Sequence, residues 1–174
     1  MIDAISNAIR DALEVLREKD GMLFDCPIEV EAEYDARKLH EVCINHRMAM
    51  HLENEIIPLL DDNEEYFADI EFNREGINFK EIAIAGQKRR VRPDIIIHNR
   101  KSGDDKKNIL VVECKKRGAD EVEIEFDIKK IESFITTPEY SYQFGLQIIY
   151  GSDGIEGKLI FLQNNELRLQ PVEC

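Results

Sequence analysis

The sequence predicts an α/β fold, with a central mixed β-sheet of roughly four to six strands and helices packed on both of its faces. Two amphipathic helix patterns come first, a run of short apolar strands follows, and one further helix separates this run from two last strands. The 174 residues fit one domain, and 43% hydrophobic residues supply enough apolar surface for a genuine core. No internal repeat, low-complexity segment or interdomain linker is evident, so we expect a single domain over residues 1–174.

Two helix patterns occupy the first sixty or so residues. Apolar residues recur every three or four positions over 2–18, and Asp20-Gly21 ends this pattern. A longer pattern over about 36–60 has apolar stripes on two opposite sides, which predicts a helix that lies between the sheet and another helix. The expected domain therefore has an N-terminal helical extension, a core, and a C-terminal strand and tail, over 1–35, 36–150 and 151–174.

The strands are predicted from short apolar runs bounded by turn residues. PDIIIH and ILVVECK flank the polar loop 99–108, which predicts an antiparallel hairpin. A later helix stops before Thr137-Pro138, because a proline disfavours helical backbone at the residue before it. The expected ranges of this helix and of the other strands are 127–135 for the helix and 66–73, 79–85, 144–150 and 158–162 for the strands.

Charge is distributed unevenly along the chain. The net charge of −13 argues at first against a nucleic-acid partner, because polyphosphate is usually bound by a basic surface. Residues 86–118, however, hold eleven basic and four acidic residues, so this segment carries +7 and the rest of the chain −20. The basic run KRRVR leads directly into PDIIIH, which favours a phosphate-binding role over a solvated loop or a targeting patch for Lys88, Arg89, Arg90 and Arg92.

The remaining composition points to a cytoplasmic protein with no membrane partner. No stretch approaches the roughly 20 apolar residues of a membrane span, and the first residues, MIDAISNAIRDALEVL, have acids where a signal peptide has basic residues. The four cysteines are scattered, with no CxxC pair and no histidines at zinc-ligand spacing. We expect reduced thiols at Cys26, Cys43, Cys114 and Cys174.

Two acids and one lysine are expected to meet at the end of the hairpin. Side chains alternate along a strand, so Glu113 and Lys115 share a face, and pairing around the loop brings Asp94, just after Pro93, near Glu113. Two close carboxylates repel each other, and Mg²⁺ removes this conflict because it binds one or two carboxylates together with water and phosphate oxygens. A lysine beside the cation can orient, or help to deprotonate, a water for attack on phosphorus.

This pattern, Pro93-Asp94 followed by Glu113-Cys114-Lys115, resembles the signature of the PD-(D/E)XK nuclease superfamily. RPDIIIH and NILVVECKK are similar to the sequences of small bacterial members around these motifs, and the resemblance covers about 36–150. It implies a restriction-endonuclease-like three-layer core and an endonuclease that cleaves DNA with Mg²⁺ (or Mn²⁺), leaving 3′-hydroxyl and 5′-phosphate ends. Many such nucleases act as dimers, so a homo-oligomer is also implied.

The resemblance implies a role for each matching residue. Asp94 and Glu113 would be metal ligands, with the backbone carbonyl of Cys114 as a third, and Lys115 would be the catalytic lysine. Glu41 in LHEVCINHRMAMHLE corresponds to the helix glutamate that contacts the metal directly or through water. Further candidates are an acid on the preceding strand, a histidine on the Asp94 face of its strand, and two lysines that would contact nucleic acid, namely Glu71, His98, Lys116 and Lys130.

Each of these residues also has a plain structural explanation. Asp94 could cap a turn, Glu113 and Lys115 could form an ordinary edge ion pair, and Glu41 could belong to a solvated helix face. The change from apolar residues to charge on one face of ILVVECK favours a site. The alternative function is a catalytically inactive protein of the same fold that acts as a protein- or nucleic-acid-interaction module, with the acidic remainder binding a protein partner.

Overall fold

A computed structural model describes residues 1–23, 34–61, 63–75, 78–84, 87–151 and 153–173. The α-helices are α1 (Ile2–Asp20), α2 (Tyr34–Ile56) and α3 (Glu121–Thr136), and short 3-10 helices are η1 (Gly21–Leu23), η2 (Ile57–Leu59) and η3 (Gly103–Asp105). The strands are β1 (Phe67–Ile70), β2 (Arg74–Glu75), β3 (Asn78–Phe79), β4 (Glu81–Ile84), β5 (Gln87–Arg90), β6 (Ile95–His98), β7 (Asn108–Lys116), β8 (Phe144–Gly151), β9 (Gly154–Gln163) and β10 (Glu166–Glu173).

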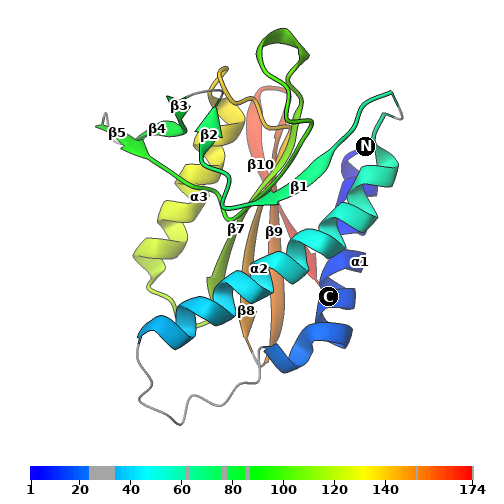
Figure 1. Cartoon of the computed structure of the whole chain (residues 1–174), viewed down its shortest axis with the longest axis vertical. Coiled ribbons are helices and arrows are strands. Elements are labelled where there is room, and N and C mark those ends of the chain that lie inside the picture. The colour runs from blue at the N-terminus through cyan, green and yellow to red at the C-terminus, as the bar shows by residue number, and fades with distance from the viewer. Residues whose placement is uncertain (24–33, 62, 76–77, 85–86, 152, 174) are drawn as a thin grey trace.

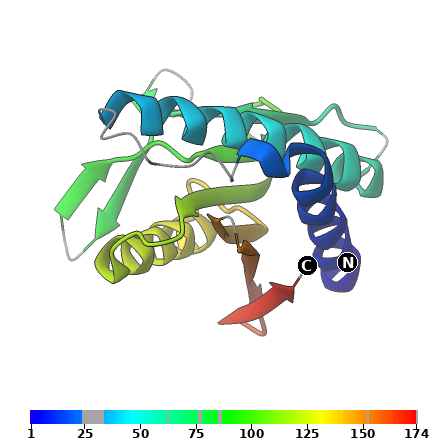
Figure 2. The same cartoon turned by 90° about the horizontal axis from the view of Figure 1, so that it is seen from below.

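Three layers make up the fold. A six-stranded mixed sheet in the order β1-β6-β7-β8-β9-β10 lies in the middle, with α1 and α2 on one face and α3 on the other (Figures 1 and 2). β6 and β7 form the predicted antiparallel hairpin, and β7 and β8 are parallel and joined through α3. The predicted α/β class is therefore confirmed. Among the residues described, no helix has the length and apolar character needed to cross a membrane.

The two faces of the sheet bury separate apolar clusters. The larger one includes Leu13 of α1 and Leu52 of α2, and the smaller one includes Phe134 of α3. Ile95 belongs to the larger cluster and its neighbour Ile96 to the smaller one, so β6 is buried on both faces. This explains why PDIIIH reads as a continuous apolar run and not as an alternation of apolar and polar residues.

Only one of the two apolar stripes expected on α2 is buried. Ile44, Met48 and Leu52 pack into the larger cluster, whereas Val42 and Met50 on the other stripe are exposed. α1 packs against α2 and also reaches β9 and β10, so it lies beside α2 in the same layer and does not cover its outer side (Figure 2). The expectation that α2 lies between the sheet and a helix was therefore wrong.

The C-terminal region expected to be a strand and tail is part of the central sheet. β9 begins at Gly154, earlier than predicted, and residues expected to form a tail make the edge strand β10. Pro171 is accommodated there because an edge strand has one side without ladder partners. Of the cysteines, Cys43 and Cys114 are free thiols, while Cys26 and Cys174 lie outside the described residues.

Candidate functional site

The pairing of β6 with β7 brings Asp94 and Glu113 to one end of the sheet. Ile95 lies opposite Val112, and the same register continued by one residue places Asp94 opposite Glu113. Asp94 Oδ2 accepts a hydrogen bond of 2.8 Å from the backbone N–H of Cys114. Asp94 is thus bound to the neighbouring strand, and its position is explained by more than the turn that precedes it.

Glu113 lies on the face of the sheet that α3 covers and is 2% exposed. Its Oε2 atom is 2.6 Å from the amine of Lys130, which also donates to the backbone carbonyl of Arg92 at 3.1 Å. Lys130, which the sequence predicts to be a phosphate contact, is buried beside Glu113, because α3 turns this side chain toward β7. Glu113 Oε1 is buried and accepts no hydrogen bond from the described residues.

Lys115 projects from the same strand face and pairs with a second acid. Its Nζ atom lies 3.3 Å from Oδ2 of Asp127 on α3, so the ordinary edge pair of Glu113 with Lys115 is not what forms. Asp127 is buried, and sequence reasoning does not single it out. The signal was present, because Asp127 precedes the buried Ile131 by one helical turn and so puts a charge on the apolar stripe of α3.

The electrostatics of this site follow from burial and crowding. Burial raises the pKa of Glu113 well above its ordinary value, and the nearby Asp94 and Asp127 add to this effect against the opposing Lys130. Burial also raises the pKa of Asp94 and of Asp127, although nearby lysines lower both. Burial lowers the pKa of Lys115, but Asp127 outweighs it and the pKa lies above its ordinary value. Three acids share two amines, so an added cation would relieve their repulsion.

The donor set suits a hard cation better than zinc. Within the described ranges, no three His, Cys, Asp or Glu side chains form a group that could hold a metal ion. Mg²⁺ needs fewer protein ligands, because one or two carboxylates with water and substrate phosphate oxygens suffice. Asp94 and Glu113 supply two carboxylates, and Oε1 of Glu113, which has no hydrogen-bond partner among the residues described, is a candidate oxygen ligand. The Cys114 thiol has a pKa raised well above its ordinary value by burial, which disfavours the thiolate that zinc binds.

Of two other expected site residues, Glu71 is hydrogen-bonded to Asp94, whereas Glu41 lies on the helix that packs on the other face of the sheet. The N–H of Glu71 donates to the backbone carbonyl of Asp94 at 2.9 Å, and its carboxylate pairs with Arg92 at 3.1 Å. Glu41 is exposed on α2, which packs on the face of the sheet opposite α3. Burial raises the pKa of Tyr150, and Glu41 contributes to this, so Glu41 lies toward the same end of the sheet. No hydrogen bond or ion pair joins Glu41 to Asp94 or Glu113 in the described part of the chain.

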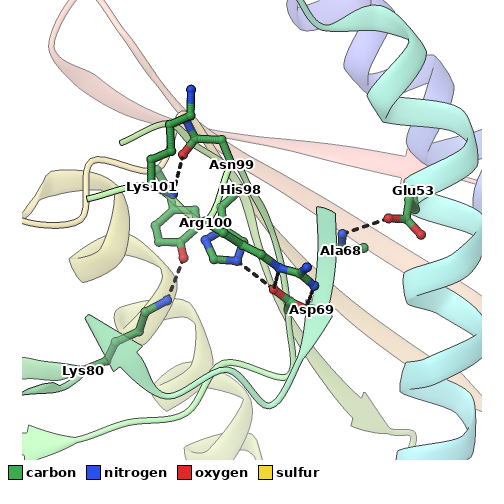
Figure 3. Close-up of polar contacts among 9 residues, drawn as sticks. Glu53, Ala68, Asp69, Lys80, His98, Asn99, Arg100 and Lys101 are labelled. Atoms are coloured by element: carbon green, nitrogen blue, oxygen red, sulfur yellow. Dashed lines mark hydrogen bonds and ion pairs between the residues drawn. The ribbon is translucent and has the colours of Figure 1, made fainter. Parts of the chain in front are cut away.

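His98 shares a strand face with Asp94 but lies at the other end of β6, about 13 Å away at 3.3 Å per residue. Its Nε2 atom is hydrogen-bonded to Asp69 Oδ2 at 2.9 Å, and Asp69 also binds the Arg100 guanidinium (Figure 3). His98 therefore lines a different space from the one beside Glu113.

The basic run joins the site through Arg92. Lys88, Arg89 and Arg90 belong to β5, which pairs with β4 and projects with it from the body of the molecule (Figure 1). All three are exposed, and the Arg90 guanidinium stacks 4.5 Å from the centre of the Phe79 ring. The first three residues of KRRVR therefore belong to a strand, and not to the solvated loop that was one alternative for this run. Lys116, at the end of β7, is partly exposed.

No family model matches this sequence, and no curated protein matches it. Among solved structures, the chain is similar to one described as the crystal structure of SSO0001, with 15% identity and a TM-score of 0.34. The match covers 91% of this chain and 67% of that chain. A likeness at this level carries no argument about fold or function.

Proposed function

We propose that the protein is a divalent-cation-dependent nuclease that hydrolyses phosphodiester bonds in DNA. The observation that carries the proposal is the meeting of Asp94, Glu113 and Lys115 at adjoining strand ends, on the face that α3 covers. β6 and β7 are both largely buried strands. Their pairing gathers carboxylates and amines where burial alone would favour apolar side chains.

Asp94, Glu113 and the backbone carbonyl of Cys114 would hold the cation. Glu113 Oε1 has no hydrogen-bond partner among the described residues, and Asp94 uses Oδ2 for the Cys114 N–H. When bound, Mg²⁺ would stabilise charge on the phosphate oxygens and make a bound water more acidic. A phosphate oxygen of the substrate and water would complete its coordination.

The two lysines have separate tasks in this proposal. Lys115, whose amine is held by Asp127 at 3.3 Å, orients the attacking water or a phosphate oxygen. Lys130 holds the carboxylate of Glu113 through the 2.6 Å contact and is a positioning residue. Arg92 and the exposed basic side chains of β5 bind the flanking phosphates and so keep the DNA beside the site.

A plasmid-nicking assay with Mg²⁺ or Mn²⁺ tests the proposal. Asp94→Asn keeps an oxygen that can accept the Cys114 N–H, and Glu113→Gln and Lys115→Met keep side-chain size. Each should reduce the nicking rate by about 100-fold or more, because each removes a charged group that acts on the reacting phosphate. Glu121→Gln, an exposed change in the first turn of α3, serves as the control and should keep the wild-type rate.

Glu41 is tested in the same assay. Glu41 is exposed on α2, and no hydrogen bond or ion pair joins it to Asp94 or Glu113 in the described part of the chain. Glu41→Gln should therefore reduce nicking less than Asp94→Asn does. A loss as large as that of Asp94→Asn would instead support the metal-contacting role implied by the superfamily resemblance.

The alternative function keeps the fold without catalysis. Lys130 and Lys115 already pair with Glu113 and Asp127, so these acids can be structural ion pairs that need no cation. In this alternative the protein binds a partner through its acidic surface. Metal-independent behaviour that is equal in wild type and in the three site variants supports this alternative. Nicking that needs the cation and is lost in the variants supports the nuclease.

A further inference from the structure

A pocket of about 450 Å³ lies over β8, β9 and β10, and we call it the β8–β10 pocket. The side chain of Gln147 at its wall faces α3, because its Nε2 atom donates to the backbone carbonyl of Ile124 on that helix. Residues paired on neighbouring strands point to the same side of a sheet. Five lining residues therefore share the face on which α3 packs, namely Gln147, Ile149, Glu156, Lys158 and Pro171.

The β8–β10 pocket continues a row of side chains that begins at the candidate site. Glu113 on β7 lies opposite Gln147 on β8, and Gln147 lies opposite Lys158 on β9. Lys115 likewise lies opposite Ile149. Neighbouring strands are about 4.8 Å apart, so the pocket begins one strand away from the residues of the candidate site. Both spaces lie on the same face and toward the same end of the sheet.

Gln147 presents a hydrogen-bond acceptor to the pocket. Its side chain is 2% exposed, and its Nε2 atom donates to the Ile124 carbonyl at 2.8 Å. This bond assigns the orientation of the amide, because only the nitrogen can donate. The Oε1 atom accepts no hydrogen bond from the described residues. An acceptor that is nearly enclosed by protein and has no protein partner can bind an N–H group of a ligand.

Lys158 and Glu156 add groups of opposite charge. Lys158 is partly buried, and its amine makes no hydrogen bond or ion pair with the described residues. Glu156 Oε1 accepts a hydrogen bond from Arg117 at 2.7 Å, and no described residue donates to its Oε2 atom. The side chains of Ile149 and Pro171 supply apolar surface beside these groups. The pocket thus combines one donor and two acceptors with an apolar wall.

We propose that the β8–β10 pocket binds a nucleobase. The edge of a base carries N–H donors next to carbonyl or ring-nitrogen acceptors, and glutamine, glutamate and lysine pair with such edges. Apolar side chains such as those of Ile149 and Pro171 pack on the flat face of a base. A volume of about 450 Å³ lies within the roughly 300–1,000 Å³ of pockets that enclose drug-sized ligands, so a base with its sugar fits.

The base can come from a DNA strand or from a free nucleoside. The first source rests on the proposed nuclease function, and in that case the pocket recognises a base close to the bond that is cleaved. The row from Glu113 to Lys158 supports this source, because it joins the two spaces on one face of the sheet. The second source requires no catalysis at Asp94 and Glu113.

Titration of the full chain with adenosine, cytidine, guanosine and thymidine in turn, followed by ¹⁵N–¹H NMR, tests the proposal. At least one nucleoside should shift the backbone amides of Gln147, Ile149 and Lys158 until the shifts saturate. Ribose has no base and should leave these amides unshifted. The titrations contain EDTA and no divalent cation, so their result does not depend on nuclease activity.

Two variants remove hydrogen-bonding groups from the pocket. Lys158→Met and Gln147→Met should each weaken binding of the preferred nucleoside about five-fold or more, because one hydrogen bond to the base is lost. Gln147→Met also loses the bond to Ile124, whereas the amine of Lys158 has no partner among the described residues, so Lys158→Met is the cleaner test. Lys129→Met, an exposed change on α3, is the control and should keep the wild-type affinity within about two-fold.

Three results overturn the proposal. These are shifts that do not saturate with any of the four nucleosides, equal shifts with ribose, and wild-type affinity in Lys158→Met. Plasmid nicking is measured separately with Mg²⁺. If nicking is absent while nucleoside binding is intact, the nuclease is wrong and the pocket stands. If nicking is present without nucleoside binding, only the pocket is wrong.

Competition resolves the source of the base. A short single-stranded DNA oligonucleotide of the preferred base is added to the nucleoside complex in EDTA. If it displaces the nucleoside and shifts the same amides, the pocket accepts a base of a DNA strand. If it does not, the ligand is the free nucleoside. Either result, with binding weakened in Lys158→Met, supports the nucleobase pocket.

Discussion

The amine of Lys130 lies 2.6 Å from Oε2 of Glu113, and both side chains are buried between α3 and the sheet. This contact joins a helix to the strand that carries the acid of the candidate site. A buried ion pair contributes little compared with an apolar pair of similar size, but removing one partner leaves a charge without compensation. The integrity of the site and the stability of the fold are therefore coupled at this pair.

Lys130→Met should destabilise the protein by about 3 kcal/mol, because Glu113 then remains buried with no amine beside it. Urea unfolding monitored by circular dichroism measures this change. The double variant Glu113→Gln/Lys130→Met should recover much of the loss, since the uncompensated charge is gone. A single variant as stable as the wild type would show that the pair does not hold α3 in place.

Gly145→Ala should destabilise the protein by about 1–3 kcal/mol through overpacking. A Cβ atom at this position on β8 would lie 2.0 Å from Cγ2 of Ile131 and 3.1 Å from Cδ1 of Ile135, so α3 would have to move. Thermal or urea unfolding measures the loss. Combining the change with Ile131→Ala should restore part of the stability by making room. If Gly145→Ala alone is neutral, the close packing of α3 on β8 is not as tight as the structure has it.

The hairpin of the candidate site could be predicted because its signals are local. β6 is buried on both faces, β7 changes from apolar residues to charge at Glu113, and a polar loop over 99–107 separates them. In the sequence these features are two apolar runs with a polar loop between them, which is the pattern of a hairpin. The meeting of Asp94 with Glu113 follows from the register once the hairpin is known.

The contribution of α3 could not be obtained in the same way. Which side chains of α3 reach β7 depends on the rotation of the helix and its distance from the sheet. Both depend on the close approach of Ile131 to Gly145 on the next strand, which the sequence pattern does not reveal. The start of α3 was also placed too late, although Asp120 caps it by accepting a hydrogen bond from the Val122 N–H at 2.8 Å. Asp120 followed by Glu123 is a helix-start signal, and using it would have begun the predicted helix near Glu121, where α3 begins.

Asn99→Ala should loosen the loop between β6 and β7. The change removes three side-chain hydrogen bonds, to the N–H groups of Lys101 and Lys107 and to the carbonyl of Asp105, and should cost about 1–3 kcal/mol. Amide hydrogen exchange at Lys101 and Lys107 should become faster. Asn99→Asp keeps the two accepted bonds and should protect these amides better than alanine does. Equal exchange in all three proteins would contradict the role given to Asn99.

Protonation of His98 should make the protein less stable as the pH falls below about 6.5, the ordinary pKa of histidine. Burial lowers the folded-state pKa of His98, so between the two values the unfolded chain binds more protons than the folded one. The free energy of unfolding therefore rises with pH in this range. The stabilising contribution is complete above the unfolded value and is lost as the pH falls through the folded one.

A variant comparison isolates this effect, because other groups titrate over an overlapping range with the opposite sign. Glu113 and Asp94 have raised pKa values, so their protonation on acidification favours the folded state. His98→Gln removes the imidazole and keeps a group that can donate to Asp69. Between about pH 7 and about pH 5, urea unfolding should show a greater loss of stability in wild type than in His98→Gln. His98→Asn should agree with His98→Gln, and parallel pH profiles for wild type and both variants would contradict a buried neutral His98.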